Sequence, residues 1–147
     1  MSAVRLRPAA AADIAAVVRV FRRSVRTALP FLPDLHTAEE DLVHFGSYLG
    51  TGRITLAEAD GALLGFLVET PGWIEHLYLD PDRRGGGIGR MLVDGAKSRH
   101  ERLELWCFEQ NLAARAFYRA QGFEEVRRTA GENEAGLPDI LFAWERG

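Results

Sequence analysis

Apolar residues recur along the chain at two spacings, which divide it into alternating helices and strands. Spacings of three and four residues, typical of helices packed on one face, follow Asp13, Thr37, Gly87 and Asn111. Shorter apolar or alternating runs predict strands at residues 4–7, 53–58, 62–69, 73–79, 103–108, 123–128 and 139–144. The predicted order is β-α-α-β-β-β-α-β-α-β-β, which indicates an α/β fold.

Several element boundaries carry residues with a defined backbone role. Thr37 and Glu40 have the spacing of a capping box, which is worth about 1 kcal/mol at the start of a helix. Asp60-Gly61 predicts a tight hairpin turn because both residues tolerate positive φ. Asn111 is expected to cap the last helix and Gly122 to close it.

The same spacing predicts which helix faces are buried. Gly95 is expected to permit close packing of the third helix on the sheet. Strands 73–79 and 103–108 should run parallel because a helix connects them. The inward residues of the second helix are predicted to be Leu42, Val43, Phe45 and Leu49, and those of the last helix Leu112, Ala116, Phe117 and Ala120.

Composition narrows the functional classes. The 147 residues, 47% of them apolar, predict one domain spanning residues 1–147. The net charge of −3 argues against a nucleic-acid-binding surface. We expect a cytoplasmic protein with no membrane partner, because no apolar run approaches the length of a bilayer span and the start lacks the pattern of a secretion signal. The single cysteine, Cys107, excludes an internal disulfide and a cysteine-based zinc cluster, and no metal is predicted.

The stretch Trp73–Leu92 has the features of an anion-binding site. It joins a strand, a turn, four glycines within five residues and the start of a helix. Glycines let the backbone approach a ligand closely, and free N–H groups at a helix start favour phosphate. A P-loop would need Lys and Ser or Thr after Gly89. A dinucleotide fingerprint would need glycine at Arg90, although Glu109 lies about where a ribose-binding carboxylate is expected. A glycine-rich turn without a ligand is the remaining alternative.

Two motifs give a more specific interpretation. Residues 84–89, Arg-Gly-Gly-Gly-Ile-Gly, fit Q/R-x-x-G-x-G/A, and residues 111–123 fit N-x-x-A-x-x-F-Y followed by Gly-Phe. In these motifs and in the order of its elements, the chain resembles the GCN5-related N-acetyltransferase (GNAT) family over essentially its whole length. The resemblance implies a single-domain, mixed and mostly antiparallel twisted sheet, with helices on both faces and two splayed parallel central strands. It also implies acetyl transfer from acetyl-CoA, as co-substrate, to a primary amine.

The resemblance assigns roles to particular residues. The pantetheine arm is expected along the strand edge of Leu77, Tyr78 and Leu79, where a backbone N–H would hold the oxyanion. Asn111 would cap its helix and also contact the pantetheine, and Tyr118 would contact acetyl-CoA and act as general acid. The pyrophosphate is expected on the backbone of Arg84, Gly85, Gly86, Gly87, Ile88, Gly89 and Arg90.

The proton acceptor is a separate question. Strand alternation places Glu75 on the same side as Leu77, so Glu75 is favoured as the base, provided that burial raises its pKa toward about 6–7. His76 would face the opposite side, and His36 or an ordered water are further candidates. Attack through an acetylated Cys107 is disfavoured because a mid-strand cysteine is usually a core residue. Direct attack in a ternary complex is therefore expected.

The acceptor is expected between the first two helices and the last hairpin. Either a small-molecule or a peptide amine is compatible with the sequence, and a homodimer is a family expectation. The alternative function is a CoA-binding sensor or interaction module without turnover. The residues considered for the acceptor site are Phe31, His36, Trp73, Trp106, Glu132, Glu134 and Trp144.

Overall fold

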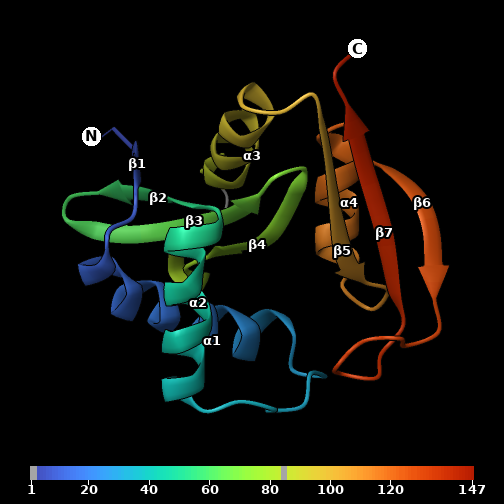
Figure 1. The fold of residues 1–147 in the computed structure, drawn as a ribbon, viewed down its shortest axis with the longest axis horizontal. Helices are drawn as coiled ribbons and strands as arrows, with labels where there is room; N and C mark the ends of the chain where they lie inside the picture. Colours follow the sequence, from blue (N-terminus) through green and yellow to red (C-terminus); the bar gives the residue numbers. More distant parts are fainter. Residues whose placement is uncertain (1–2, 84–85) are drawn as a thin grey trace.

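The computed structural model describes residues 3–83 and 86–147, and within these ranges seven strands form one sheet in the order β1-β2-β3-β4-β5-β7-β6 (Figure 1). The strands are β1 Arg5–Pro8, β2 Arg53–Ala59, β3 Ala62–Thr70, β4 Trp73–Leu79, β5 Arg102–Phe108, β6 Glu124–Thr129 and β7 Asp139–Glu145. The helices are α1 Ile14–Ala28, α2 Ala38–Thr51, α3 Ile88–Ser98 and α4 Leu112–Ala120, with short 3-10 turns η1 at Ala11–Asp13 and η2 at Pro81–Arg83. The element order predicted from the sequence is confirmed.

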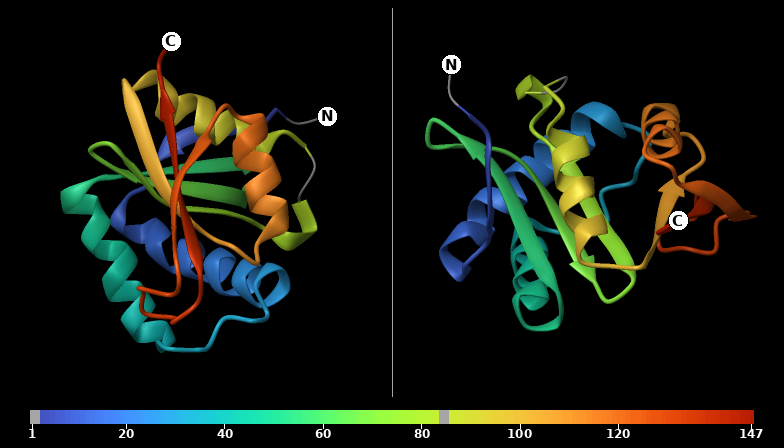
Figure 2. Two further views of the ribbon diagram at one scale, coloured as in Figure 1. Left: turned by 90° about the vertical axis from the view of Figure 1, so that its right-hand side faces the viewer. Right: turned by 90° about the horizontal axis from the view of Figure 1, so that it is seen from above.

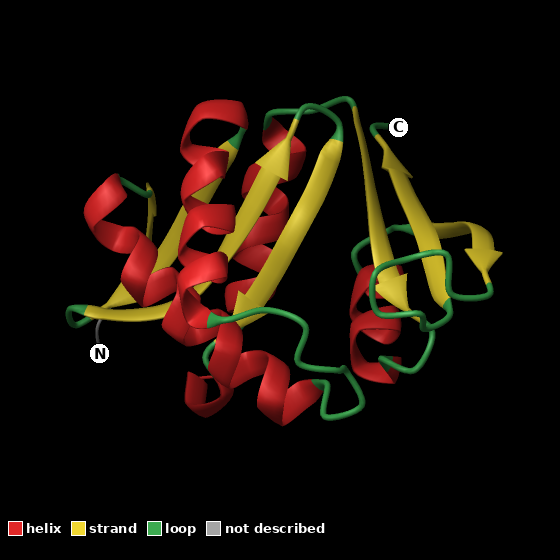
Figure 3. Ribbon diagram, turned by 60° about the horizontal axis from the view of Figure 1, so that its bottom comes forward, coloured by secondary structure: helices red, strands yellow, loops and turns green. Residues whose placement is uncertain are grey.

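The sheet is antiparallel except where β4 meets β5. These two strands run in parallel, and Trp73↔Glu104 is their one paired position in the described residues. The Glu104 N–H also donates to the Gly72 carbonyl at 2.9 Å, which holds the strands together at this end only. Beyond that point β4 and β5 diverge (Figure 3). The predicted splay of two parallel strands is therefore present.

Two layers of helices enclose the sheet. Helices α1 and α2 lie on one face of β2–β4 and α3 lies on the other (Figure 1). Strands β5, β7 and β6 form a second unit with α4, set to one side of β1–β4 (Figure 2). The apolar core consists of two clusters. One joins α1 and α2 to the sheet through Val17 and Phe45, and the other contains Leu92 of α3 and continues through Tyr118 of α4 and Phe142 of β7, so it links β2–β4 to the second unit.

The local signals in the sequence produce the expected structures. The Thr37 hydroxyl accepts from the Glu40 N–H, and the Glu40 carboxylate accepts from the Thr37 N–H, so the capping box is complete. Residues Asp60 and Gly61 have φ of 54° and 75°, as the hairpin turn requires. Gly122 ends α4 with φ of 90°. No helix in the described ranges is long and apolar enough to cross a membrane.

The predicted inward faces of α2 and α4 are wrong apart from Phe45 and Phe117. On α2, Val43 is 75% exposed, and the inward side carries Asp41, Phe45 and Tyr48. On α4, Leu112 is 69% exposed. Both helices have short apolar patterns that fit two rotations about the helix axis, and contacts with distant aromatic residues select the one observed. The α4 residues that pack into the core are Ala114, Phe117 and Tyr118.

Close packing of α3 depends on Gly89 rather than on Gly95. A Cβ at Gly95 would lie 3.7 Å from the Arg99 guanidinium, which is an ordinary contact. A Cβ at Gly89 would lie 3.2 Å from the Phe117 ring, closer than most real contacts. Gly89 therefore lets the start of α3 approach α4 and narrows the space between them.

Candidate active site

The start of α3 presents unpaired backbone donors. Gly87 is the N-cap, with φ of 75° and no side-chain cap, and its carbonyl accepts from the Met91 N–H at 3.0 Å. The N–H groups of Ile88, Gly89 and Arg90 therefore precede the first helical hydrogen bond and have no acceptor within the helix. Gly86 and Gly87 are exposed, so an anion can reach this end of the helix. The expected roles of Arg84 and Gly85 lie outside the described residues.

The strand edge expected to hold the pantetheine is open. Leu77 and Leu79 pair with β3 on one side, opposite Leu67 and Gly65. On the other side β5 has already diverged, so β4 has no strand partner there among residues 3–83 and 86–147. Backbone N–H and C=O groups on such an edge can bind an amide-rich chain as an added strand. At Asn111 the side-chain oxygen accepts from the Ala114 N–H at 3.2 Å, so the predicted cap is confirmed.

Tyr118 lies between the two diverging strands. Its ring packs against Phe117, Phe123 and Phe142 with centroid distances of 5.3, 5.6 and 6.3 Å, and the residue is 8% exposed. Burial raises the pKa of Tyr118 well above its ordinary value, and the nearby Cys107 of β5 and Tyr78 of β4 raise it further. The phenol is therefore protonated at neutral pH. Its hydroxyl has no hydrogen-bond partner in the described part of the chain.

Cys107 and Arg115 border the same space. Burial raises the pKa of the Cys107 thiol to about 11, and the Arg115 charge offsets only part of that shift. The thiol is thus protonated at neutral pH and is a poor nucleophile. Arg115 donates from Nη1 to the Glu109 carbonyl at 3.0 Å, which holds the turn between β5 and α4. Its Nε is buried and lacks a partner among the described residues.

A β-bulge changes the geometry around Glu75. The β3–β4 register pairs Glu69 with Ile74 and Val68 with His76, which leaves Glu75 without a strand partner. Ile74 and Leu77 consequently pack into the same cluster although they are three residues apart. The alternation argument that placed Glu75 with Leu77 does not apply across this bulge. Glu75 is exposed, and its carboxylate accepts from the Thr70 hydroxyl at 2.8 Å.

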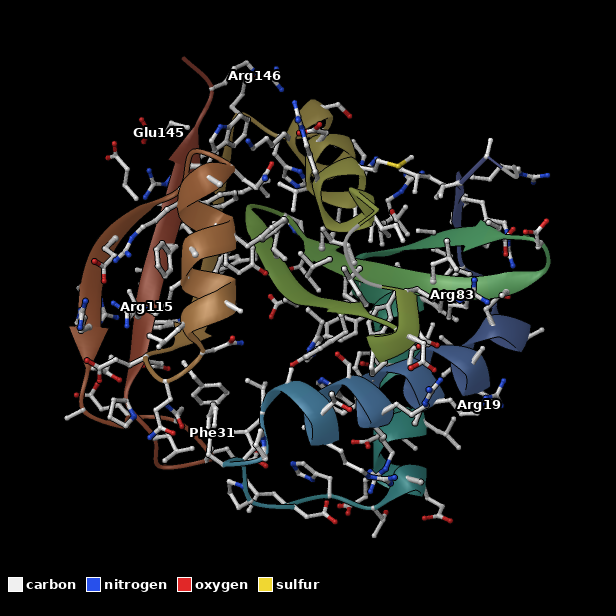
Figure 4. The ribbon with its side chains drawn as sticks, turned by 180° about the vertical axis from the view of Figure 1, so that it is seen from behind. Arg19, Phe31, Arg83, Arg115, Glu145 and Arg146 are labelled. Atoms are coloured by element: carbon white, nitrogen blue, oxygen red, sulfur yellow. The ribbon has the colours of Figure 1, made fainter. Side chains whose placement is uncertain are left out.

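A cavity of about 1140 Å³ lies between α1, α2, the end of β4 and the connection from β6 to β7. Of the residues considered for the acceptor site, His36 and Glu134 line it, and these two side chains are paired with each other. Phe31 is outside the lining but reaches from the segment after α1 toward the C-terminal strands, where its ring lies 6.1 Å from that of Phe108 (Figure 4). The remaining candidates, Trp73, Trp106, Glu132 and Trp144, are not among the lining residues.

The lining of the cavity is rich in carboxylates. Asp41 is buried and neutralised by an ion pair with Arg22. The other acidic lining residues are exposed, and Arg26 is the remaining lining arginine among the described residues. The rim therefore favours a cation. The exposed acidic residues are Asp34, Glu39, Glu40 and Glu134.

The inner wall of the cavity carries aromatic side chains and a histidine pair. His76 and Tyr78 project from β4 toward α1 and α2, where both rings contact Phe21 with centroids at 5.9 and 5.1 Å. His44 of α2 completes the pair, with 3.3 Å between its Nε2 and that of His76. Among the described residues, no group of three or more His, Cys, Asp or Glu side chains is arranged to hold a metal ion.

Comparison with known proteins identifies the family. A family model for an acetyltransferase (GNAT) domain matches residues 50–125. Peptidyl-lysine N-acetyltransferase YjaB of Salmonella typhimurium is 35% identical over 115 residues, which cover 77% of this chain and 78% of that protein. The chain belongs to the GNAT family.

Other GNAT proteins extend the likeness to the whole chain. Peptidyl-lysine N-acetyltransferase YiaC of Escherichia coli is 28% identical over 140 residues, covering 95% of each chain. The solution structure of apo-form YjaB from Escherichia coli superposes with a TM-score of 0.80 at 26% identity, covering 97% of each chain. PaiA N-acetyltransferase from Thermoplasma acidophilum, solved in complex with coenzyme A, has a TM-score of 0.77 at 18% identity over 98% of this chain and 99% of that one. This last likeness concerns the fold alone.

The sequence pattern did not indicate every residue of this GNAT site. His44 and Tyr48 were not predicted to line the site, because the apolar pattern on α2 favoured Leu42 and Leu49 as its inward residues. A usable signal was present: Asp41, His44 and Tyr48 recur at spacings of three and four residues, which places polar and aromatic groups on one helix face. Such a stripe beside a buried aromatic residue indicates a helix that faces a binding cavity rather than the core alone.

Proposed function

We propose that this protein transfers the acetyl group of acetyl-CoA to a primary amine, with Tyr118 as the general acid. The observation that carries the proposal is the position of Tyr118. Its ring is buried between the diverging strands β4 and β5, and its hydroxyl has no hydrogen-bond partner among the described residues. The hydroxyl oxygen is not among the buried polar atoms that lack a partner, so it is accessible and a bound molecule can take up its hydrogen bond.

The residues at the start of α3 fit the pyrophosphate of acetyl-CoA. The N–H groups after Gly87, which have no acceptor within the helix, and the positive end of the helix dipole favour phosphate oxygens. The absence of a side chain at Gly89 lets this end of α3 lie against Phe117 of α4. From there the open edge of β4 leads toward Tyr118. Leu77, Tyr78 and Leu79 would pair with the pantetheine, and a backbone N–H near Leu77 would stabilise the oxyanion.

The proton on Tyr118 is suited to the departing thiolate. Attack of the amine on the thioester forms a C–N bond and breaks the C–S bond, after which the sulfur needs a proton. The raised pKa of Tyr118 keeps the phenol protonated at every physiological pH. The protonated thiol of Cys107 makes a covalent acetyl-cysteine unfavourable, which supports direct attack in a ternary complex.

We infer that the amine is a lysine side chain of a peptide or protein. The acidic rim attracts a cationic group, and a cavity of about 1140 Å³ is large enough for more than a lysine side chain. YjaB and YiaC, which are named peptidyl-lysine N-acetyltransferases, support the same inference. A lysine amine has an ordinary pKa of about 10.4 and must lose a proton before it attacks. Glu75 and His76 of β4 are the candidates for accepting that proton.

The decisive experiment measures CoA-thiol release from acetyl-CoA in the presence of an amine panel. The panel contains a lysine peptide with a blocked N-terminus, the same peptide with arginine in place of lysine, a peptide with a free N-terminus, and a small polyamine. We expect release that depends on the blocked lysine peptide and that is absent with its arginine counterpart. Release with the polyamine alone would assign a small-molecule acceptor.

Thermal shift separates this function from its rivals. Acetyl-CoA should stabilise the fold in proportion to RT ln(1 + [L]/Kd), whereas NAD should not. Stabilisation by acetyl-CoA with no amine-dependent release over the whole panel would indicate a CoA-binding sensor module instead. The cytoplasmic location and the homodimer stay predictions, which cell fractionation and sedimentation of the purified chain can test.

A further inference from the structure

His76 occupies an unusual position for a polar side chain. It follows the β-bulge at Glu75 and is surrounded by rings from three elements, including Phe45 at a centroid distance of 4.8 Å and Tyr78 at 6.0 Å. It also lines the acceptor cavity. A polar group in such surroundings needs a hydrogen-bond partner, and its partner identifies its role.

That partner is His44, and the contact extends toward the surface. The Nε2 atoms of His76 and His44 are 3.3 Å apart, and the Tyr48 hydroxyl lies 3.2 Å from the same His44 nitrogen. Burial and the charge of Glu75 raise the pKa of Tyr48 to about 12, so its hydroxyl stays protonated and can donate. The distances fit the tautomer in which His76 carries the Nε2 proton and donates it to His44 Nε2, with the Tyr48 hydroxyl beside the same nitrogen.

This assignment leaves His76 Nδ1 as a free acceptor. No described residue hydrogen-bonds to that nitrogen, and it is not among the buried polar atoms that lack a partner, so it is open to the cavity. His44, by contrast, is exposed. The pair therefore connects an acceptor atom inside the cavity to a donor atom in contact with water.

We propose that His76 and His44 form a proton relay that takes the proton from the attacking amine and delivers it to solvent. The proposal rests on the acetyl transfer inferred above. One proton of the acceptor ammonium passes to His76 Nδ1, the Nε2 proton of His76 passes to His44 Nε2, and His44 releases its Nδ1 proton to water. The neutral amine then attacks the thioester carbon and forms the C–N bond. As the C–S bond breaks, Tyr118 protonates the departing sulfur, and the second proton of the attacking nitrogen replaces the Tyr118 proton through water. An ammonium and acetyl-CoA thus give an amide, the CoA thiol and one released proton, and exchange with water returns both imidazoles to their starting tautomers.

The surroundings of His76 favour a relay over storage of the proton on one ring. Burial and the nearby His44 lower the pKa of His76 to about 3, so His76 alone is a weak base and can take a proton at Nδ1 only as it gives one up from Nε2 to His44. The titratable groups that face it are His44 and Tyr48 from α2 and Tyr78 from β4, whereas α1 contributes the uncharged ring of Phe21. Glu75 is the rival acceptor, but its carboxylate is exposed, bonded to Thr70 and absent from the cavity lining.

The test measures kcat, the KM for acetyl-CoA and the pH profile of five variants, the fifth being Glu75→Gln. In His76→Gln and His44→Gln we expect kcat to fall about 100-fold or more, the usual contribution of positioned proton transfer, with the KM for acetyl-CoA changed less than threefold. Activity in both should rise with pH toward the pKa of the amine, because only amine that is already deprotonated can react. His76→Ala should regain at least tenfold in kcat with added imidazole. His100→Gln, matched in residue type and placed after α3, should keep the wild-type kcat.

The outcomes separate the relay from the function on which it rests. Wild-type kcat and an unchanged pH profile in His76→Gln and His44→Gln overturn the relay and leave acetyl transfer intact. If kcat falls 100-fold in Glu75→Gln but keeps its wild-type value in the His76 variants, the relay is overturned and Glu75 is the base. No amine-dependent release by the wild-type protein overturns both proposals. The melting temperature of every variant, measured with and without acetyl-CoA, establishes that the fold and the acetyl-CoA-binding site are preserved.

Discussion

Replacing Tyr118 with phenylalanine should separate stability from activity. The substitution removes one oxygen and keeps the ring that contacts Phe117, Phe123 and Phe142. Since the hydroxyl has no hydrogen-bond partner among the described residues, no protein hydrogen bond is lost there. Burying a hydroxyl without a partner costs about 1–3 kcal/mol, and residual access to water relieves part of that cost. We expect the free energy of unfolding to stay constant or to rise by about 1 kcal/mol.

The effect on turnover should be large. Loss of a general acid costs about 100-fold to 10,000-fold in rate, which corresponds to a barrier higher by about 3–5 kcal/mol. The hydroxyl is expected to act on the departing sulfur, so the affinity for acetyl-CoA should change by less than about threefold, since only interactions specific to the transition state alter kcat alone. Urea unfolding, thermal shift with acetyl-CoA and CoA-thiol release measure the three quantities on one preparation.

Phe142→Leu is the matched control. Phe142 is fully buried beside Tyr118, so its truncation should cost about 1–2 kcal/mol of stability while leaving kcat within a factor of about three. An unchanged kcat in Tyr118→Phe would remove Tyr118 from the chemistry. A loss of more than about 1 kcal/mol in its unfolding free energy would show that the hydroxyl stabilises the fold, and would refute the packing argument.

Three further predictions concern stability. Gly52→Ala should lower the free energy of unfolding in urea by about 2–3 kcal/mol, because a Cβ would lie 2.2 Å from the Glu69 carbonyl oxygen. Gly50→Ala, with nothing within 4 Å of the new Cβ, should be neutral or gain up to about 1 kcal/mol. Equal effects of the two substitutions would contradict the close approach of Gly52 to Glu69. Thr37→Ala should lose about 1 kcal/mol by the same measurement, and no loss would mean that the capping box is dispensable. Because the pKa of His76 is lowered in the folded state, His76 in the unfolded chain binds a proton between about pH 6.5 and pH 3 while His76 in the folded chain does not. The free energy of unfolding therefore falls as the pH falls, by at most about 1.4 kcal/mol per pH unit. His76→Gln should show a shallower fall between pH 7 and pH 5, and identical slopes would place the titration elsewhere.

The features that the sequence predicted are those decided by a few neighbouring residues. The capping box needs only Thr37 and Glu40, and the hairpin needs only Asp60 and Gly61. The glycine stretch is also local, because a left-handed N-cap at Gly87 and an open helix start depend on adjacent backbone positions. The region proposed for the co-substrate can therefore be located from the amino-acid sequence alone.

The features that escaped prediction depend on residues far apart in the chain. The bulge at Glu75 is a register shift between β3 and β4, and nothing within β4 alone marks it. The rotation of α2 is selected by Phe45, whose ring meets Phe21 of α1 at 4.9 Å and Phe66 of β3 at 5.6 Å. His44 and His76 are separated by 32 positions, so their contact follows only once both the bulge and that rotation are set.

The two halves of the site therefore respond differently to substitution. On the proposed function, backbone groups of the glycine stretch and of the β4 edge would bind acetyl-CoA, so we expect them to tolerate many side-chain changes as long as Gly89 still admits Phe117. Side chains from α1, α2 and the β6–β7 connection line the cavity proposed for the acceptor, and each depends on packing between distant segments. Substitutions on the α2 face that lines the cavity can then change the accepted amine or the proton path without disturbing the acetyl-CoA-binding region. On this basis we expect chains with the same glycine motif to share acetyl-CoA and to differ in the amine.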